Sequence, residues 1–111
     1  MLALLAAAPL QAASLVGEWN LDAARCDDAR IAYTADGRHE SLQRGDDGWA
    51  TLASGSYTLE GKTLVVEFQG QSETLEVVAL DAGRLVLRNA DPARRSASGV
   101  DEVAFVRCPA R

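Results

Sequence analysis

The chain has 111 residues, a length typical of a single domain. Its net charge of −5 comes from 11 basic and 16 acidic residues, and this balance argues against sequence-independent binding of nucleic acid, which requires a basic face. The densest basic spot is Arg94-Arg95, so the sequence predicts no nucleic-acid partner.

Residues 1–13 read MLALLAAAPLQAA and carry no charge. This run is shorter than the roughly 20 apolar residues that span a bilayer, so we expect no stable membrane span. It is typical of the apolar region of a signal peptide, with a cleavage site near Ala12 or Ala13 and a start that lies upstream. We therefore predict a periplasmic or secreted domain at 14–111; the alternative is an N-terminal helix packed on the fold.

Turn signals recur about every ten residues after this leader, which is typical of an all-β chain. Asp36-Gly37 and Asp47-Gly48 are strong hairpin turn pairs. Between the turns lie eight strand-like runs: LVGEWNL (15–21), RIAYT (30–34), RHESLQ (38–43), WATLASGSYTL (49–59), TLVVEF (63–68), ETLEVVAL (73–80), RLVLR (84–88) and EVAFVR (102–107). Only 21–30 could hold one helical turn. The sequence predicts an antiparallel meander of about eight strands, closed into a small barrel that leaves no exposed edge.

Alternation along these runs predicts which side chains face the interior. The expected inward residues are Trp19, Leu21, Ile31, Tyr33, Trp49, Tyr57, Leu64, Val66, Phe68, Leu75, Val77, Ala79, Leu85, Leu87 and Phe105. An eight-strand barrel is either filled by its own side chains or holds one small ligand. Because the chain is short, we expect a filled interior and a function carried by the loops and rims.

The first strand opens with Gly17-Glu18-Trp19. A glycine here lets a neighbouring group approach the strand, and Trp19 would fill the closed end of the barrel. Arg107 on the last strand is placed to stack on the indole, with Arg88 as the other candidate. This pattern resembles the lipocalin-like (calycin) barrels, which open with Gly-x-Trp and often place an arginine of the last strand over that tryptophan. Full lipocalins are longer and carry a C-terminal helix, so the chain is more similar to the short bacterial lipocalin-like domains.

Two weaker resemblances add inhibitor activity to the functions that the sequence allows. Gly17, Trp19 and Cys26 resemble the start of the periplasmic metalloprotease inhibitors of the Inh type. The run SGSYTLEGK (54–62) is similar in residue types to a loop of the periplasmic C-type lysozyme inhibitors. We therefore expect a non-catalytic binding module of unknown ligand or partner; the alternatives are an inhibitor of a protease or lysozyme, and a carrier of a small apolar ligand.

The two cysteines, Cys26 and Cys108, lie near the two ends of the predicted domain. An even count in an exported chain suggests a disulfide, and two free thiols are the alternative. The bridge would close a loop of roughly 80 residues, a stabilisation of about 4 kcal/mol in the chain-entropy model. Cys26 lies beyond the first strand, so the bridge requires the chain to double back at 22–28, or a different strand count.

No catalytic, metal or cofactor site stands out. His39 is the single histidine, and we expect it to be exposed after the Asp36-Gly37 turn. Ser41 would share its strand face, but no third group completes a nucleophilic site. The carboxylates of Asp46 and Asp47 fit a polar hairpin turn better than a calcium loop. We therefore expect no enzyme activity.

The longest expected loop is NADPARRSASG (89–99), which we predict to be irregular. Its Arg94 and Arg95, with Tyr57, are the candidate partner-binding residues, because paired guanidinium groups could meet an acidic partner or a phosphate. A solvated loop is the alternative. We expect the protein to be a monomer.

Overall fold

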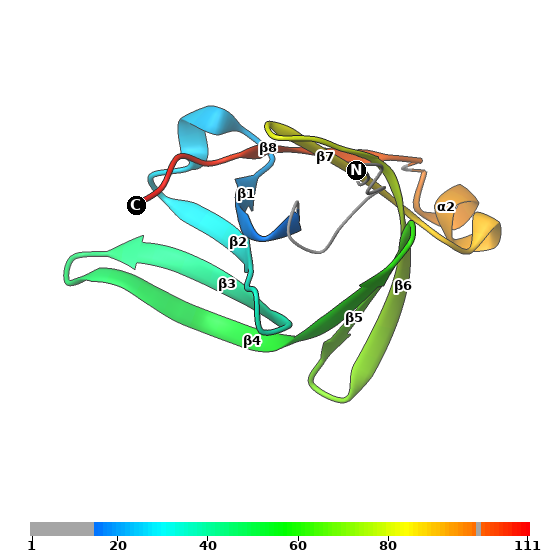
Figure 1. Cartoon of the computed structure of the whole chain (residues 1–111), viewed down its shortest axis with the longest axis horizontal. Helices are drawn as coiled ribbons and strands as arrows, with labels where there is room; N and C mark the ends of the chain where they lie inside the picture. The colour runs from blue at the N-terminus through cyan, green and yellow to red at the C-terminus, as the bar shows by residue number, and fades with distance from the viewer. Residues whose placement is uncertain (1–14, 100) are drawn as a thin grey trace, which may run out of the picture.

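The computed structural model describes residues 15–99 and 101–111, so the predicted signal peptide at 1–13 lies outside the described residues. Eight antiparallel strands follow one another around a closed barrel, which confirms the predicted meander (Figure 1). The strands are β1 (Gly17–Asn20), β2 (Ala29–Tyr33), β3 (Arg38–Gly45), β4 (Gly48–Glu60), β5 (Thr63–Phe68), β6 (Gln71–Leu80), β7 (Arg84–Asn89) and β8 (Val103–Arg107).

The barrel closes through a short seam between its first and last strands. Trp19 pairs with Arg107 and Asn20 with Val106. Just beyond this ladder, the backbone N–H of Cys108 donates a hydrogen bond of 2.7 Å to the carbonyl of Glu18. The seam is thus formed by few backbone contacts, and other interactions must help to hold it.

The predicted disulfide between Cys26 and Cys108 is confirmed, with a Cα–Cα distance of 5.6 Å. The chain doubles back after β1 through a 3₁₀ turn, η1 (Ala23–Arg25), as the bridge requires. The Asp22 side chain caps this turn, and the Asn20 side-chain amide donates to the carbonyl of Ala29 at 2.7 Å. Local polar groups therefore bring Cys26 back beside the end of β8.

The core consists of inward-facing apolar side chains from most strands. Its buried members are Leu15, Trp19, Tyr33, Tyr57, Leu64, Val66, Val77, Leu85 and Leu87, with Ile31, Leu59, Leu75, Leu80 and Phe105 packed against them. Most of the inward residues predicted from alternation are therefore in or against this core. The exceptions are explained by strand ends and bulges.

A bulge in β4 makes the inward assignment of Trp49 wrong. Ser41 of β3 pairs with Ala53, whereas the next residue, Leu42, pairs with Thr51, so Leu52 is an extra residue and is 62% exposed. A one-residue insertion moves every later side chain to the opposite face of a strand. Trp49 consequently lies on the outer face, although simple alternation from Tyr57 places it inside.

Two further inward predictions are wrong. In β6, Val77 pairs with Leu87 and Ala79 with Val86, so Val78 is a second bulge residue. The bulge turns Ala79 outward and brings Leu80 against the core. Leu21 is 62% exposed because β1 ends one residue before it.

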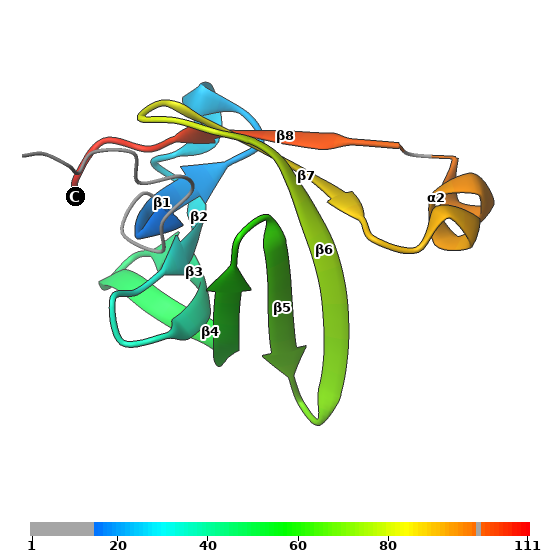
Figure 2. The same cartoon turned by 45° about the vertical axis from the view of Figure 1, so that its right-hand side comes forward.

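The loop at 89–99 is not irregular, which corrects the sequence prediction. It contains α2 (Pro92–Ser98), which lies at the end of the barrel away from the C-terminus (Figure 2). The Asp91 side chain accepts from the Ala93 N–H, Pro92 starts the helix, and Gly99 ends it at φ 74°. No helix within 15–99 and 101–111 is long and apolar enough to cross a membrane.

Candidate functional site

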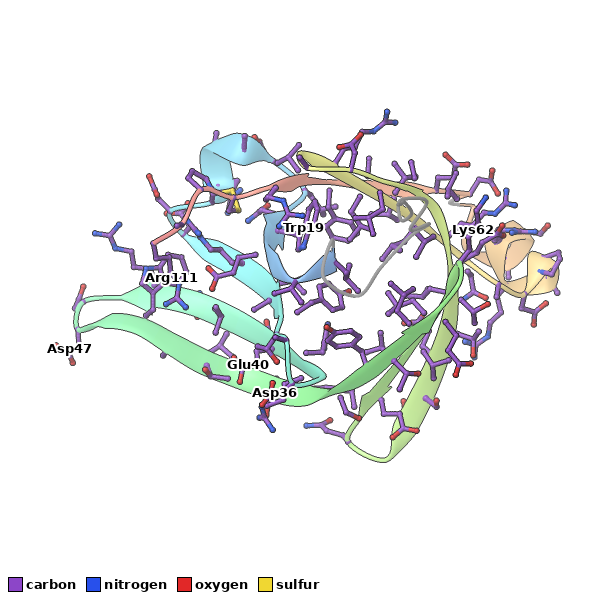
Figure 3. All side chains as sticks on the ribbon, in the orientation of Figure 1. Trp19, Asp36, Glu40, Asp47, Lys62 and Arg111 are labelled. Carbon is purple, nitrogen blue, oxygen red and sulfur yellow. A yellow bond between two sulfur atoms is a disulfide. The ribbon has the colours of Figure 1, made fainter. Side chains whose placement is uncertain are left out.

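The end of the barrel near the C-terminus is filled by Trp19 (Figure 3). The indole is completely buried, and its N–H donates to the carbonyl of Leu15 at 3.1 Å. The guanidinium carbon of Arg107 lies 4.3 Å from the centroid of the indole ring. Arg88, the other sequence candidate for this stacking, instead donates to Glu76 at 2.8 Å.

Gly17 makes this close arrangement possible. A Cβ at this position would lie 2.2 Å from Nη1 of Arg107, and the backbone φ is +149°. Nη1 also donates to the carbonyl of Val16 at 2.9 Å. Because a side chain at residue 17 would displace the guanidinium, the glycine and the arginine belong to one structural unit with Trp19.

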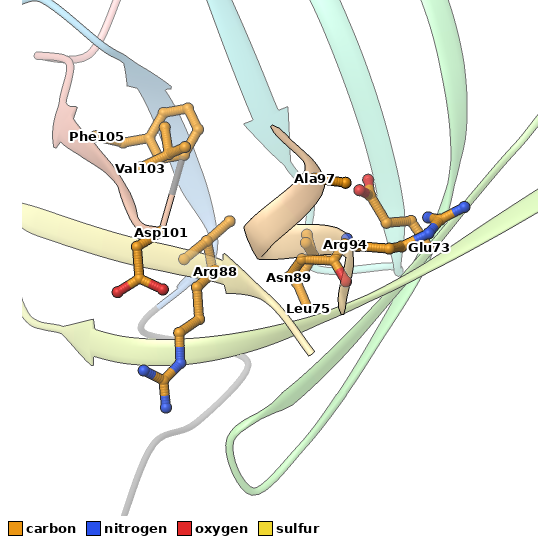
Figure 4. A pocket seen from close by; sticks show the side chains of 10 residues that line it. Glu73, Leu75, Arg88, Asn89, Arg94, Ala97, Asp101, Val103 and Phe105 are labelled. Atoms are coloured by element: carbon orange, nitrogen blue, oxygen red, sulfur yellow. The ribbon is translucent and has the colours of Figure 1, made fainter. Parts of the chain in front are cut away.

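The opposite end of the barrel is hollow. A cavity of about 740 Å³ opens beside α2 (Figure 4) and is lined by Glu73, Leu75, Leu87, Arg88, Asn89, Arg94, Ala97, Asp101, Val103 and Phe105. Its apolar side chains lie on the inner face of β6, β7 and β8, in register with the core residues Val77 and Leu85. The expectation of a completely filled interior is therefore wrong at this end.

The cavity's mouth carries charged side chains of both signs, and several of them are paired. Arg88 is held by Glu76 on the outer face, and Arg95 lies 3.6 Å from Asp101. Arg95 also donates to the carbonyl of Asn89 at 3.1 Å. Of the predicted partner-binding pair, Arg94 therefore lines the mouth, whereas Arg95 ties α2 to the adjacent backbone.

Two tyrosines lie inside the barrel. The rings of Tyr33 and Tyr57 meet edge to face with centroids 5.2 Å apart. The hydroxyl of Tyr57 donates to the carbonyl of Thr34 at 2.7 Å, and the residue is 7% exposed. Tyr57 is therefore a core residue, and its burial argues against the predicted partner-binding role. Burial, and then the charge of Glu73, raise the pKa of Tyr33 to about 12, so its hydroxyl stays protonated at neutral pH.

His39 is half-buried and faces inward, which corrects the prediction of an exposed histidine. It pairs with Tyr33 across β2 and β3, and the two ring centroids are 5.2 Å apart. Its Nδ1 is buried and has no hydrogen-bond partner among the residues that the structure describes. The strand begins directly after the turn, so His39 already belongs to the inner face. Burial lowers the pKa of His39, because the charged ring loses water contacts.

We expect the His39→Gln variant to lose less stability than the native protein as the pH falls. A histidine whose pKa is lowered on folding binds more protons in the unfolded chain, so its stabilising effect is lost below the unfolded value of about 6.5. Urea unfolding measured at pH 7.5, 6.5, 5.5 and 4.5 would test this. The carboxylates contribute equally to the pH dependence of the unfolding free energy in both proteins. The difference between the two pH profiles therefore reports the contribution of His39. Parallel pH profiles would contradict the expectation.

A second cluster, which the sequence reasoning missed, lies on the outer face of β1 and β2. Arg30 is 5% exposed and donates to the carbonyl of Cys26 at 2.7 Å and to Glu18 at 3.2 Å. Arg111 donates twice to the same carboxylate, at 2.9 Å for each bond. Both guanidinium groups lie over Trp49, at 5.3 and 5.4 Å. This cluster attaches the C-terminal residues to the barrel wall, and no local sequence signal marks it.

The described residues contain no group of three or more His, Cys, Asp or Glu side chains that could hold a metal ion. The structure therefore offers two features for a functional interpretation: the packed end around Trp19 and the apolar cavity beside α2.

No family model and no curated protein matches the sequence. Among solved structures, a lipocalin-like protein from Bacteroides uniformis ATCC 8492 superposes with a TM-score of 0.58 at 16% sequence identity, covering 85% of this chain and 98% of that one. Bovine odorant binding protein, in complex with a selenium-containing odorant, gives a TM-score of 0.43 at 15% identity, covering 98% and 80% of the two chains. The chain thus has a lipocalin-like fold, as the resemblance of Gly17-x-Trp19 predicted.

Proposed function

We propose that the protein is a non-catalytic binding protein that holds a small apolar molecule in the cavity beside α2. The observation that supports this is the cavity itself, which has apolar inner walls and an opening to solvent. Its volume of about 740 Å³ lies in the range of about 300–1,000 Å³ that is usual for small-molecule sites. Such walls bind ligands by removing apolar surface from water.

The packed end supports the same proposal. Trp19 and Leu85 are completely buried, so the interior of the barrel is well packed outside the cavity. A preformed cavity loses little conformational entropy when a ligand binds, so less of the binding free energy is spent on ordering the protein. The barrel therefore combines a rigid closed end with a preformed open one.

We also propose that the protein acts in the periplasm or outside the cell. A disulfide persists in oxidising compartments and is rare in the cytosol. The apolar leader at 1–13 is consistent with export.

We expect the protein to bind the neutral dye N-phenyl-1-naphthylamine, and the Leu75→Gln variant to bind it about tenfold more weakly. Leu75 is a partly buried wall residue, and a polar side chain there would remove apolar contact worth about 1.4 kcal/mol. Dye fluorescence measured by titration gives the affinity. Val78→Gln is the matched control, because this exposed bulge residue lies on the same strand but outside the cavity.

Absence of dye binding to the native protein would contradict the proposed function. An equal loss in both variants would place the dye elsewhere on the molecule. Melting temperatures of the two variants, measured by circular dichroism, would show that each remains folded.

A further inference from the structure

Glu73 is the one acidic residue that the described strands place on the inner wall of the barrel. It pairs with Val66 across β5 and β6, and it precedes Leu75 by two residues, so it shares their inward face. Its charge contributes to the raised pKa of Tyr33, which places the carboxylate within electrostatic reach of a hydroxyl inside the barrel. An acid in this position faces whatever occupies the cavity.

The other charged side chains described at the mouth do not pair with Glu73, so its carboxylate can interact with a ligand. Arg88 is engaged by Glu76, and Asp101 is engaged by Arg95. Glu73 and Arg94 both line the mouth, and neither forms an ion pair with any residue in the described part of the chain.

Glu73 and Arg94 would favour ligands of opposite charge. Both side chains are exposed, so water and salt screen both charges, but Arg94 lies on α2, outside the strands. Glu73 belongs to the barrel wall beside Leu75, where it is held on the cavity side by the strand. The backbone of β6 therefore directs Glu73 toward the cavity, whereas Arg94 reaches the same cavity from the helix beside its mouth.

Aromatic rings line the same two hollows as this carboxylate. Phe105 lines the cavity, and Phe68 and Val66 line a neighbouring hollow of about 320 Å³ that Glu73 shares. The faces of aromatic rings attract cations, and this attraction adds to that of a carboxylate. The mouth thus offers apolar surface, aromatic rings and a carboxylate on the inner face of β6.

We propose that the ligand of this cavity is an apolar amine, with its hydrocarbon part against Leu75, Leu87 and Phe105 and its ammonium group at Glu73. This proposal rests on the proposed function and specifies the chemical class of the ligand. A protonated amine would form a charge-assisted hydrogen bond with the carboxylate. The aliphatic part would replace water along the apolar wall.

Three probes with the same hydrocarbon chain test the proposal: octylamine, 1-octanol and octanoate, each titrated against the dye-loaded native protein at low ionic strength. We expect octylamine to displace N-phenyl-1-naphthylamine with an affinity about tenfold higher than that of 1-octanol, and octanoate to bind most weakly. The Glu73→Gln variant should bind octylamine and octanol equally well. The Arg94→Gln variant is the matched control and should keep the preference for the amine.

Each alternative outcome has a distinct meaning. A preference for octanoate that disappears in Arg94→Gln would overturn the proposal and assign the head group to Arg94. Equal binding of the three probes would also overturn it, while leaving the apolar cavity intact. Failure of the dye itself to bind would instead remove the proposed function. Glu73 is exposed, so its glutamine variant should keep the native melting temperature, which confirms that the fold is retained.

Discussion

Replacing Trp19 with alanine is expected to lower the free energy of unfolding by about 3–5 kcal/mol, as is usual when a large core side chain is removed. The substitution would leave a void at the closed end, break the hydrogen bond to Leu15 and remove the ring beneath Arg107. Domains of this size are stable by only about 5–15 kcal/mol, so the loss would be a large fraction of the total. Urea unfolding followed by circular dichroism measures it.

The chain offers a matched control in its second tryptophan. Trp49 lies on the outer face between the buried Arg30 and the exposed Arg111, and these cation–π contacts are worth about 2 and about 0.5–1 kcal/mol, so Trp49→Ala should cost at most about 3 kcal/mol. Equal losses in the two variants would contradict our account of the closed end. If Trp19→Ala does not fold, Trp19→Phe keeps most of the ring and should lose about 1 kcal/mol through the missing N–H donor.

Removing the disulfide with the double substitution Cys26→Ala and Cys108→Ala is expected to cost about 4 kcal/mol. The bridge links residues 82 apart in the sequence, and in the chain-entropy model such a long link strongly restricts the unfolded chain. It also supports the seam between β1 and β8, where Trp19–Arg107 and Asn20–Val106 are paired in register. Denaturant unfolding of both proteins gives the difference.

Reduction provides the control for this second prediction. Dithiothreitol in the unfolding assay should bring the native protein close to the double variant and leave the variant unchanged. A variant within about 1 kcal/mol of the oxidised protein would show that the seam is held without the bridge, and would refute the expected contribution of loop closure.

The sequence contained enough local information to predict the strands and their order. Turn pairs such as Asp36-Gly37 and Asp47-Gly48 mark hairpins through backbone conformations that few residues adopt, and short hairpins force neighbours in sequence to be neighbours in the sheet. The helix α2 also had local signals in Asp91, Pro92 and Gly99, which an analysis of helix caps would have detected.

Inward and outward directions were predictable only as far as the first bulge in a strand. Alternation from Tyr57 places Trp49 inside, but the extra residue Leu52 reverses the face. The same holds for Ala79 after Val78. A bulge depends on how one strand pairs with another, and two facing strands are not adjacent in any local window of the sequence.

The sequence by itself determined an all-β meander of lipocalin-like type, with Gly17 and Trp19 at its opening and a disulfide between Cys26 and Cys108, because turns, alternation and cysteine count are local or compositional properties. Only the tertiary structure decided that His39 faces inward and that the end of the barrel beside Glu73 is hollow. These features depend on strand register and on the space that remains after the barrel closes. That space is a property of all the strands together.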